Sequence, residues 1–205
     1  MNLPVGLILA GGEGSRLGRP KGDVRVTQEP MINLVIDALR SGGCEQIVVA
    51  TRDGEPPHRD SFPLKVDDIV ADANGWTGPQ AGIVSGLNLA ADLGYEWVQL
   101  APCDVPFLDS MLLEMLGSLC SDDVDVIIPV SASGDENLLA LVRTDALLAE
   151  LKQARVDGER SVQALYRNLR CMRLEDRGFN EACFHNVNTQ QDLELAEKLT
   201  TEREP

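Results

Sequence analysis

The chain has 205 residues, of which 43% are apolar, and it carries a net charge of −15 from 33 acidic and 18 basic residues. That length and apolar content suit one folded domain with a substantial core, whereas the acidic balance excludes the basic face of a diffuse nucleic-acid binder. No apolar run approaches the ~20 residues of a membrane span, and the N-terminus lacks a secretory signal pattern, so we expect a cytoplasmic protein with no membrane partner.

Along the chain, short apolar runs alternate with stretches whose apolar residues recur at helical spacing. In chain order, the first half predicts a strand at 5–9, a helix at 31–39, a strand at 46–50, a loop at 52–63 and a helix at 82–93. The second half predicts a strand at 97–101, a helix at 110–119, strands at 124–130 and 138–142, and helices at 145–152, 159–169 and 190–199. Asp109, Thr144 and Thr189 stand where helix N-caps are expected, and Asp192 falls near the third position of the last helix.

Alternating strands and helices predict a three-layer α/β fold, in which a mostly parallel, Rossmann-like sheet is covered by helices on both faces. We expect residues 1–199 to form a single domain and residues 200–205 to be a disordered tail. Sheets of this kind bind ligands outside the carboxyl ends of their strands, where the strand order reverses. The turn that follows the first strand therefore lies where a ligand is expected.

That turn holds four glycines within residues 11–18, together with the cations Arg16 and Lys21. Glycine lets a backbone approach a ligand closely, and successive N–H groups in such a turn form a concave anion site. With the two cations added, the pattern indicates polyphosphate binding. The glycine spacing fits neither the Walker pattern nor the dinucleotide fingerprint, and a mobile surface turn is the alternative for a glycine-rich loop on its own.

A single carboxylate, Asp104, comes just after the strand predicted at 97–101 and lies between Pro102 and Pro106. A carboxylate held at a strand end is well placed to bind Mg²⁺, which takes few protein carboxylates and completes its shell with phosphate oxygens and water. In isolation, a helix or turn cap is the alternative interpretation. Together with the glycine-rich turn, Asp104 predicts a magnesium site next to a bound phosphate.

Three more segments carry residues suited to a binding site. Residues 78–83 read G-P-Q-A-G-I and lead into a helix, whose N-terminal N–H groups can receive a phosphate or a base edge. Residues 158–162 read G-E-R-S-V and add the cation Arg160. Within residues 185–193, Asn188 precedes a helix, where its amide can contact a metal or phosphate or merely order the turn.

The spacing of residues 9–21 resembles the signature L-A-G-G-x(3)-R-x-G-x(2)-K of nucleotidyltransferases and matches every fixed position. The sequences P-C-D-V-P at 102–106 and N-V-N-T at 186–189 resemble segments of the molybdenum cofactor guanylyltransferases, and the likeness covers nearly the whole chain. The resemblance implies an enzyme that transfers GMP from Mg-GTP to the terminal phosphate of molybdenum-bound molybdopterin and releases pyrophosphate. It also implies transient contact with molybdoenzymes or other cofactor-assembly proteins.

The resemblance also implies roles for individual residues. Asp104 would hold Mg²⁺, while Arg16 and Lys21 would offset charge on the reacting phosphate and on the departing pyrophosphate. The nucleotide-binding residues that it implies are Leu9, Ala10, Gly11, Gly12, Lys21, Asp72, Gly82 and Asp104. The acceptor-binding residues that it implies are Arg160, Asn186 and Asn188.

Some positions depart from the family pattern or leave a choice open. Asp67 and Asp68 compete with Asp72 for the contact to guanosine. Pro20 stands where the family often has Asp, and residues 136–139 read E-N-L-L in place of the acceptor-side H-P-L/Q-P-L segment. The alternatives are therefore cytidylyl transfer to molybdopterin, nucleotidyl transfer to another phosphorylated small molecule, and nucleotide binding without catalysis.

Overall fold

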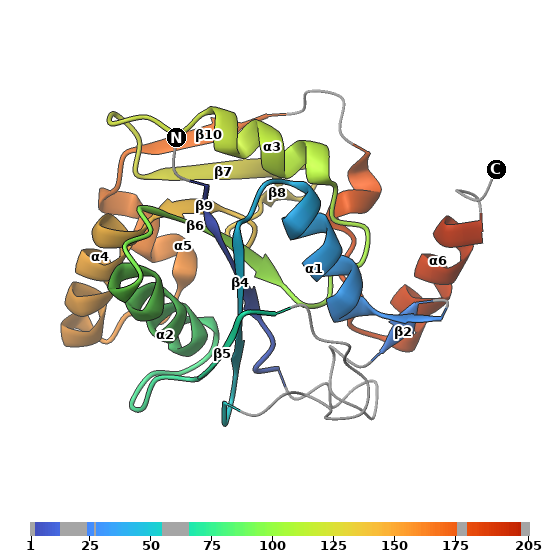
Figure 1. The fold of residues 1–205 in the computed structure, drawn as a ribbon, viewed down its shortest axis with the longest axis horizontal. Helices are drawn as coiled ribbons and strands as arrows, with labels where there is room; N and C mark the ends of the chain where they lie inside the picture. The colour runs from blue at the N-terminus through green and yellow to red at the C-terminus, as the bar shows by residue number, and fades with distance from the viewer. Residues whose placement is uncertain (1–2, 13–23, 27, 55–65, 176–179, 202–205) are drawn as a thin grey trace.

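The computed structural model describes residues 3–12, 24–26, 28–54, 66–175 and 180–201, and Figure 1 shows its fold. The strands of its main sheet are β1 (Val5–Leu9), β4 (Gln46–Thr51), β5 (Asp68–Ala71), β6 (Trp97–Pro102), β7 (Val126–Ser131), β8 (Gly134–Asp135), β9 (Leu141–Arg143) and β10 (Cys171–Leu174). They lie in the order β10-β7-β9-β6-β1-β4-β5, with β8 paired to β7. A separate ribbon joins β2 (Arg25–Val26) to β3 (Glu29–Pro30).

Most neighbouring strands in the main sheet run parallel. β1 pairs in parallel with β4 on one side and with β6 on the other, and the pairs β4–β5 and β7–β10 are also parallel. β9 runs antiparallel to both of its neighbours, β6 and β7, and β8 forms a hairpin with β7. The predicted α/β fold with a mostly parallel sheet is therefore confirmed.

Helices cover both faces of this sheet. One face carries α1 (Met31–Ser41) and α3 (Ser110–Ser118), and the other carries α2 (Pro79–Asp92), α4 (Thr144–Asp157) and α5 (Val162–Leu165). Val5 and Leu7 of β1 belong to the core on the α2 side, whereas Ile8 belongs to the core on the α1 side. A Cβ at Gly86 of α2 would sit 2.3 Å from Leu7 Cδ2, so this close approach requires glycine.

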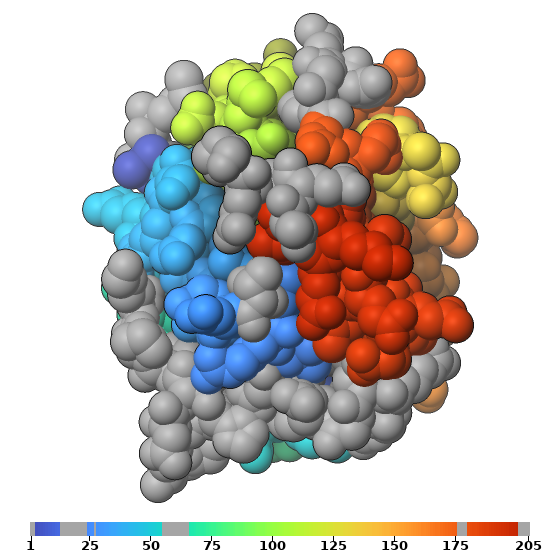
Figure 2. All heavy atoms as spheres, turned by 90° about the vertical axis from the view of Figure 1, so that its right-hand side faces the viewer, coloured from blue at the N-terminus to red at the C-terminus, as the bar shows by residue number. Residues whose placement is uncertain are grey.

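The last helix, α6 (Gln190–Thr201), packs against the β2–β3 ribbon rather than against the sheet, as Figure 1 and Figure 2 show. The apolar cluster that holds it consists of Val24, Val26, Met31, Phe107, Val187 and Ala196. The predicted cap is confirmed, because the Thr189 hydroxyl accepts a bond from the Asp192 N–H (3.2 Å) and the Asp192 carboxylate accepts one from the Thr189 N–H (2.8 Å). Thr200 and Thr201, predicted to belong to the tail, are part of this helix, and residues 202–205 lie outside the described residues.

No helix in the part of the chain that the structure describes is both long and apolar enough to cross a membrane.

The predicted cap at Asp109 is confirmed, since its carboxylate accepts a 2.9 Å bond from the Met111 N–H. The predicted cap at Thr144 is wrong. Thr144 is the first residue of α4, and its hydroxyl donates a 2.8 Å bond to the Tyr95 carbonyl instead.

The single helix predicted at 159–169 is also wrong. Gly158 ends α4 in the left-handed conformation, with φ of +71°, so the chain turns before the next element begins. Ser161 then caps the short α5, and a 3-10 turn (Tyr166–Asn168) follows. The strand predicted at 138–142 begins only at Leu141, and β5, β8 and β10 were not predicted because they are only two to four residues long.

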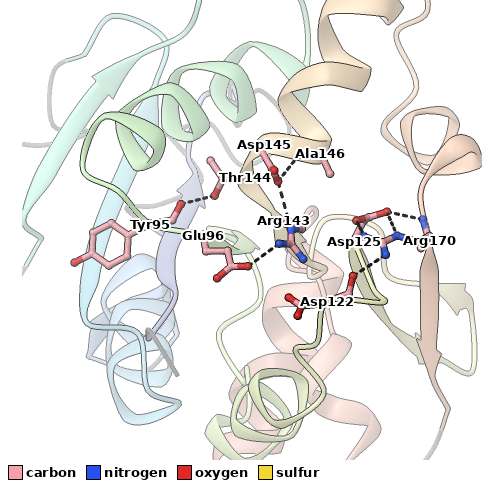
Figure 3. A network of polar contacts seen from close by, with 9 residues as sticks. All are labelled: Tyr95, Glu96, Asp122, Asp125, Arg143, Thr144, Asp145, Ala146 and Arg170. Atoms are coloured by element: carbon pink, nitrogen blue, oxygen red, sulfur yellow. Dashed lines mark hydrogen bonds and ion pairs between the residues drawn. The ribbon is translucent and has the colours of Figure 1, made fainter.

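Polar contacts fasten the edge strand β10 and helix α4 to the sheet, as Figure 3 shows. The Asp125 carboxylate accepts hydrogen bonds from the Arg170 backbone N–H (3.0 Å) and from the Arg170 Nε (2.9 Å). Nearby, Arg143 pairs with Glu96 at 2.8 Å and lies over the Trp97 ring. Hydrogen bonding to the Arg170 side chain is the main reason why the pKa of Asp125 lies below its usual value, and burial opposes that shift.

We expect Asp125→Asn to lower the free energy of unfolding by about 2 kcal/mol at neutral pH, because it removes charge-assisted hydrogen bonds from a mostly buried carboxylate. The folded-state pKa is depressed below the unfolded value of about 3.9. The contribution of this carboxylate is therefore fully present above that value and is lost as the pH falls through the folded-state pKa. Urea unfolding at a series of pH values should show the two proteins converging in acid, and a constant difference would contradict this account.

Candidate active site

The strand order reverses at β1, because the chain continues from β1 to β4 on one side and later places β6 on the other. Leu9 lies opposite Ala50 and Pro102, so the three strands end at the same level. Open α/β sheets bind ligands outside such a point, and a cavity of about 900 Å³ lies there. Its walls beyond the strand ends include residues 72–79, residues 136–139, Asn186 and Asn188.

The glycine-rich turn begins at the edge of this cavity. The Ala10 N–H donates a 2.8 Å bond to the Ala50 carbonyl, which holds the start of the turn against β4. The predicted nucleotide-binding residues that line the cavity are Leu9, Gly11, Gly12, Asp72, Gly82 and Asp104. Residues 13–23, which include the predicted catalytic cations Arg16 and Lys21, lie outside the described residues, so their roles stay predictions.

Asp72 reaches the turn from the end of β5. A Cβ at Gly11 would lie 2.8 Å from one Asp72 carboxylate oxygen, and a Cβ at Gly82 would lie 3.2 Å from the other. The carboxylate therefore fills the space between a glycine of the turn and a glycine of the first turn of α2. Partial burial raises the pKa of Asp72, and the positive charge of Arg52 opposes that rise.

The structure separates Asp72 from the two aspartates that compete with it in the sequence. The Asp67 carboxylate accepts a 2.7 Å bond from the Ile47 N–H, and the Asp68 carboxylate accepts a 2.8 Å bond from the Gln46 side chain. Both contacts lie where β4 and β5 begin, at the opposite end of these strands from the cavity. Of the three aspartates, Asp72 is the one that lines the cavity.

Asp104 stands two residues beyond β6 and is 6% exposed. Its carbonyl accepts a 2.9 Å bond from the Val187 N–H, which fastens the C-terminal part of the chain beside it. Val187 is fully buried in the cluster that holds α6, while its neighbours Asn186 and Asn188 line the cavity together with Asp104. A distant segment thus adds two asparagines to the cavity wall that also holds Asp104, the residue predicted to bind metal.

This set of oxygen donors fits Mg²⁺. One carboxylate and two amides are hard ligands, and Mg²⁺ takes its remaining ligands from phosphate groups and water. Across the described ranges, no group of three or more His, Cys, Asp or Glu side chains is placed to hold a metal, so these residues form no closed cage of the structural zinc kind. Asp104 would hold the ion, and Asn186 and Asn188 would bind either the ion or a phosphate.

Residues 136–139, where the sequence departs from the family pattern, form another wall of the cavity. The Tyr166 hydroxyl donates a 2.8 Å bond to the Asn137 carbonyl, which fixes the backbone of this segment. One carboxylate oxygen of Glu136 accepts a 2.6 Å bond from Ser131 Oγ. The segment therefore places an acidic residue in the cavity wall.

Arg160, a predicted acceptor-binding residue, is not brought to this site. It is exposed, it follows the left-handed Gly158 that ends α4, and it does not line the cavity. Conversely, Arg52 and Trp76 line the cavity although no motif marks them. Arg52 directly follows β4, and a position just after a parallel strand could have marked it in the sequence as a candidate binding residue. Trp76 lies in a loop whose sequence carries no such mark.

Known proteins resemble this chain in sequence and in fold. The sequence profile of the MobA-like NTP transferase domain matches residues 6–174. The chain is 30% identical over 198 residues to a Yersinia pestis (strain Pestoides F) protein named molybdenum cofactor guanylyltransferase, and the match covers 95% of each chain. Its structure is similar to that of molybdopterin-guanine dinucleotide biosynthesis protein A from Archaeoglobus fulgidus, with a TM-score of 0.78, 26% identity, and 97% and 99% of the two chains covered. A Mycobacterium tuberculosis H37Rv protein, solved in complex with manganese, has a similar fold (TM-score 0.70, 18% identity, 96% and 98% covered).

Helix α2 begins beside the cavity with a buried polar side chain, Gln80, in the segment that reads G-P-Q-A-G-I. Gln80 is 2% exposed, and its Nε2 group has no hydrogen-bond partner within the described part of the chain. A buried donor without a partner costs roughly 1–3 kcal/mol of stability. The unpaired Nε2 of Gln80 therefore lowers the stability of the fold at the edge of the candidate site.

We expect Gln80→Leu to raise the free energy of unfolding by about 1 kcal/mol and the melting temperature by roughly 2–4 °C. Leucine has a similar size and leaves no donor unpaired. Thermal unfolding followed by circular dichroism measures the shift, and Gln80→Glu, which buries a charge in the same space, should lower the melting temperature. A leucine variant that melts at or below the wild-type temperature would show that Nε2 is satisfied in solution.

Proposed function

The chain belongs to the family of MobA-like NTP transferase domains, and we propose that it transfers GMP from Mg-GTP to the terminal phosphate of molybdenum-bound molybdopterin and releases pyrophosphate. Family membership makes the chain a nucleotidyltransferase. The observation that carries the proposal is that Gly11, Gly12, Asp72 and Asp104 line one and the same cavity. This cavity lies at the carboxyl ends of the central strands. The names of the relatives support guanosine as the nucleoside and molybdopterin as the acceptor.

The proposed reaction needs no nucleophile from the protein. A phosphate oxygen of the acceptor attacks the α-phosphorus of GTP and forms a new P–O bond. The bond from the α-phosphorus to the β-phosphate oxygen breaks, and pyrophosphate leaves with the electron pair. The work of the protein is to hold the two phosphates in line and to offset their negative charge.

On the donor side, the backbone N–H groups of Gly11 and Gly12 would bind phosphate oxygens, and the Asp72 carboxylate would accept hydrogen bonds from guanosine. Arg16 and Lys21 would add positive charge at the reacting phosphate. Asp104 would hold magnesium, which when bound supplies charge neutralisation at the α-phosphate. The manganese complex of the mycobacterial neighbour supports the use of a divalent ion.

On the acceptor side, Asn186 and Asn188 lie in the same cavity as Asp104 and would orient the attacking phosphate. Glu136 is unsuited to a phosphate because both are negatively charged, but its carboxylate suits the N–H donors of a pterin ring. The proposal therefore places the ring of molybdopterin against residues 136–139. Transient contact with a molybdoenzyme or another cofactor-assembly protein, which would receive the product, is part of the same proposal.

We expect Asp104→Asn to lower turnover roughly 100- to 1000-fold, because an amide cannot replace the negative charge that holds the metal. The assay follows transfer of label from GTP radiolabelled at the α-phosphate to molybdenum-loaded molybdopterin, with labelled CTP as the comparison donor. Asp68→Asn, at the opposite end of the sheet, is the matched control and should keep wild-type turnover. Near-normal turnover of Asp104→Asn, or an equal rate with CTP, would overturn the assignment.

We expect Glu136→Gln to raise the KM for molybdopterin about tenfold and to leave the KM for GTP unchanged, because the lost contact is a charge-assisted hydrogen bond to the acceptor ring. Steady-state kinetics with each substrate varied in turn separate the two effects. Glu114→Gln, an exposed change on α3 outside the cavity, is the control. Equal increases in both KM values would assign Glu136 to the general shape of the cavity instead.

A further inference from the structure

One aromatic side chain of the cavity wall lies against a cation. Trp76 lines the cavity, and the guanidinium carbon of Arg155, in the last turn of α4, lies over its ring at 5.4 Å from the centroid. The ring also packs partly against the apolar core on the α2 and α4 side of the sheet. A helix on one face of the sheet therefore supports a ring that belongs to the cavity wall.

The turn around Trp76 is shaped to allow this contact. Gly75 has a left-handed backbone with φ of +79°, and a Cβ there would lie 3.0 Å from Arg155 Nη2. The Trp76 N–H donates a 3.2 Å bond to the Ala73 carbonyl, which closes the turn. Any side chain at position 75 would thus press on the guanidinium, so the turn, the cation and the indole form one unit.

The other tryptophan of the chain shows what a purely structural pair looks like. Trp97 also lies under an arginine, Arg143, at 5.8 Å from the ring centroid, but it is 6% exposed and starts β6 at the opposite end of the sheet from the cavity. Trp76 is only partly buried. Its apolar ring belongs to a cavity wall that also includes the charged residues Arg52, Asp72, Asp104 and Glu136. Core packing therefore accounts for Trp97, whereas the partly exposed ring of Trp76 packs only in part against the core and also belongs to the cavity wall.

We propose that Trp76 is a stacking platform for a flat fused ring of the 2-amino-4-oxo type, the chemistry that guanine and the pterin of molybdopterin share, and that Arg155 positions it. The inference rests on the proposed function, which supplies both rings. A cation on one face fixes the indole plane, and aromatic rings prefer an offset stack on the remaining face. Stacking also binds a ring without adding charge to a cavity that already holds three carboxylates.

Fluorescence tests the contact directly, because the chain contains two tryptophans. In Trp97→Phe, Trp76 is the sole indole, and we expect saturable quenching by GTP, by a free pterin, or by both, but none by inorganic tripolyphosphate. Quenching by GTP alone assigns the platform to the donor base, and quenching by the pterin alone assigns it to the acceptor. No quenching by either compound overturns the proposal. Should Trp97→Phe not fold, the difference between wild type and Trp76→Phe gives the same measurement.

Affinity separates stacking from a merely structural role. We expect Trp76→Leu to weaken binding of the quenching compound about tenfold, Trp76→Phe to retain most of the affinity, and Arg155→Gln to fall between them. Melting temperatures of the three variants should differ little. Equal losses of affinity in Trp76→Phe and Trp76→Leu, accompanied by lower melting temperatures, would make Trp76 an anchor of its loop and overturn the proposal. Quenching without any nucleotidyl transfer by the wild type would instead refute the proposed function and leave the stacking contact standing.

Discussion

The parallel pairing of β1 with β4 and β6 is the constraint on which the site depends. Because Leu9 lies opposite both Ala50 and Pro102, the chain leaves all three strands at one level. The turn glycines and Asp104 therefore start from adjacent positions at the ends of β1 and β6. A slip of two residues in β6 would move Asp104 by about 7 Å along the sheet and separate it from the turn.

The C-terminal segment completes the site by returning to the end of β6. The hydrogen bond from the Val187 N–H to the Asp104 carbonyl fixes this return, and burial of Val187 in the cluster that holds α6 stabilises it. Asn186 and Asn188, on either side of Val187, then line the cavity. The packing of helix α6, which lies away from the sheet, therefore helps to set where these two residues stand in the cavity wall.

Features coded by contiguous residues could be predicted from the sequence, and features that depend on distant segments could not. The strand at 5–9, the glycine turn and Asp104 belong to local sequence patterns, so the fold class and the location of the candidate site could be predicted from them. The choice of Asp72 over Asp67 and Asp68 needed the pairing of β5 with β4, a four-residue edge strand too short to show alternation. Arg160 lies outside the cavity, after the turn that Gly158 makes at the end of α4, and its role stays a prediction. Trp76 meets Arg155 only through packing between a loop and a distant helix.

A crystal structure with a non-hydrolysable GTP analogue and Mn²⁺ tests the central claim most directly, because manganese gives an anomalous signal that locates the ion. The account predicts the ion on the Asp104 carboxylate, with the triphosphate reaching the glycine turn and the guanosine beside Asp72. A metal and triphosphate bound away from Asp104, with the cavity at the ends of β1 and β6 empty, would contradict it.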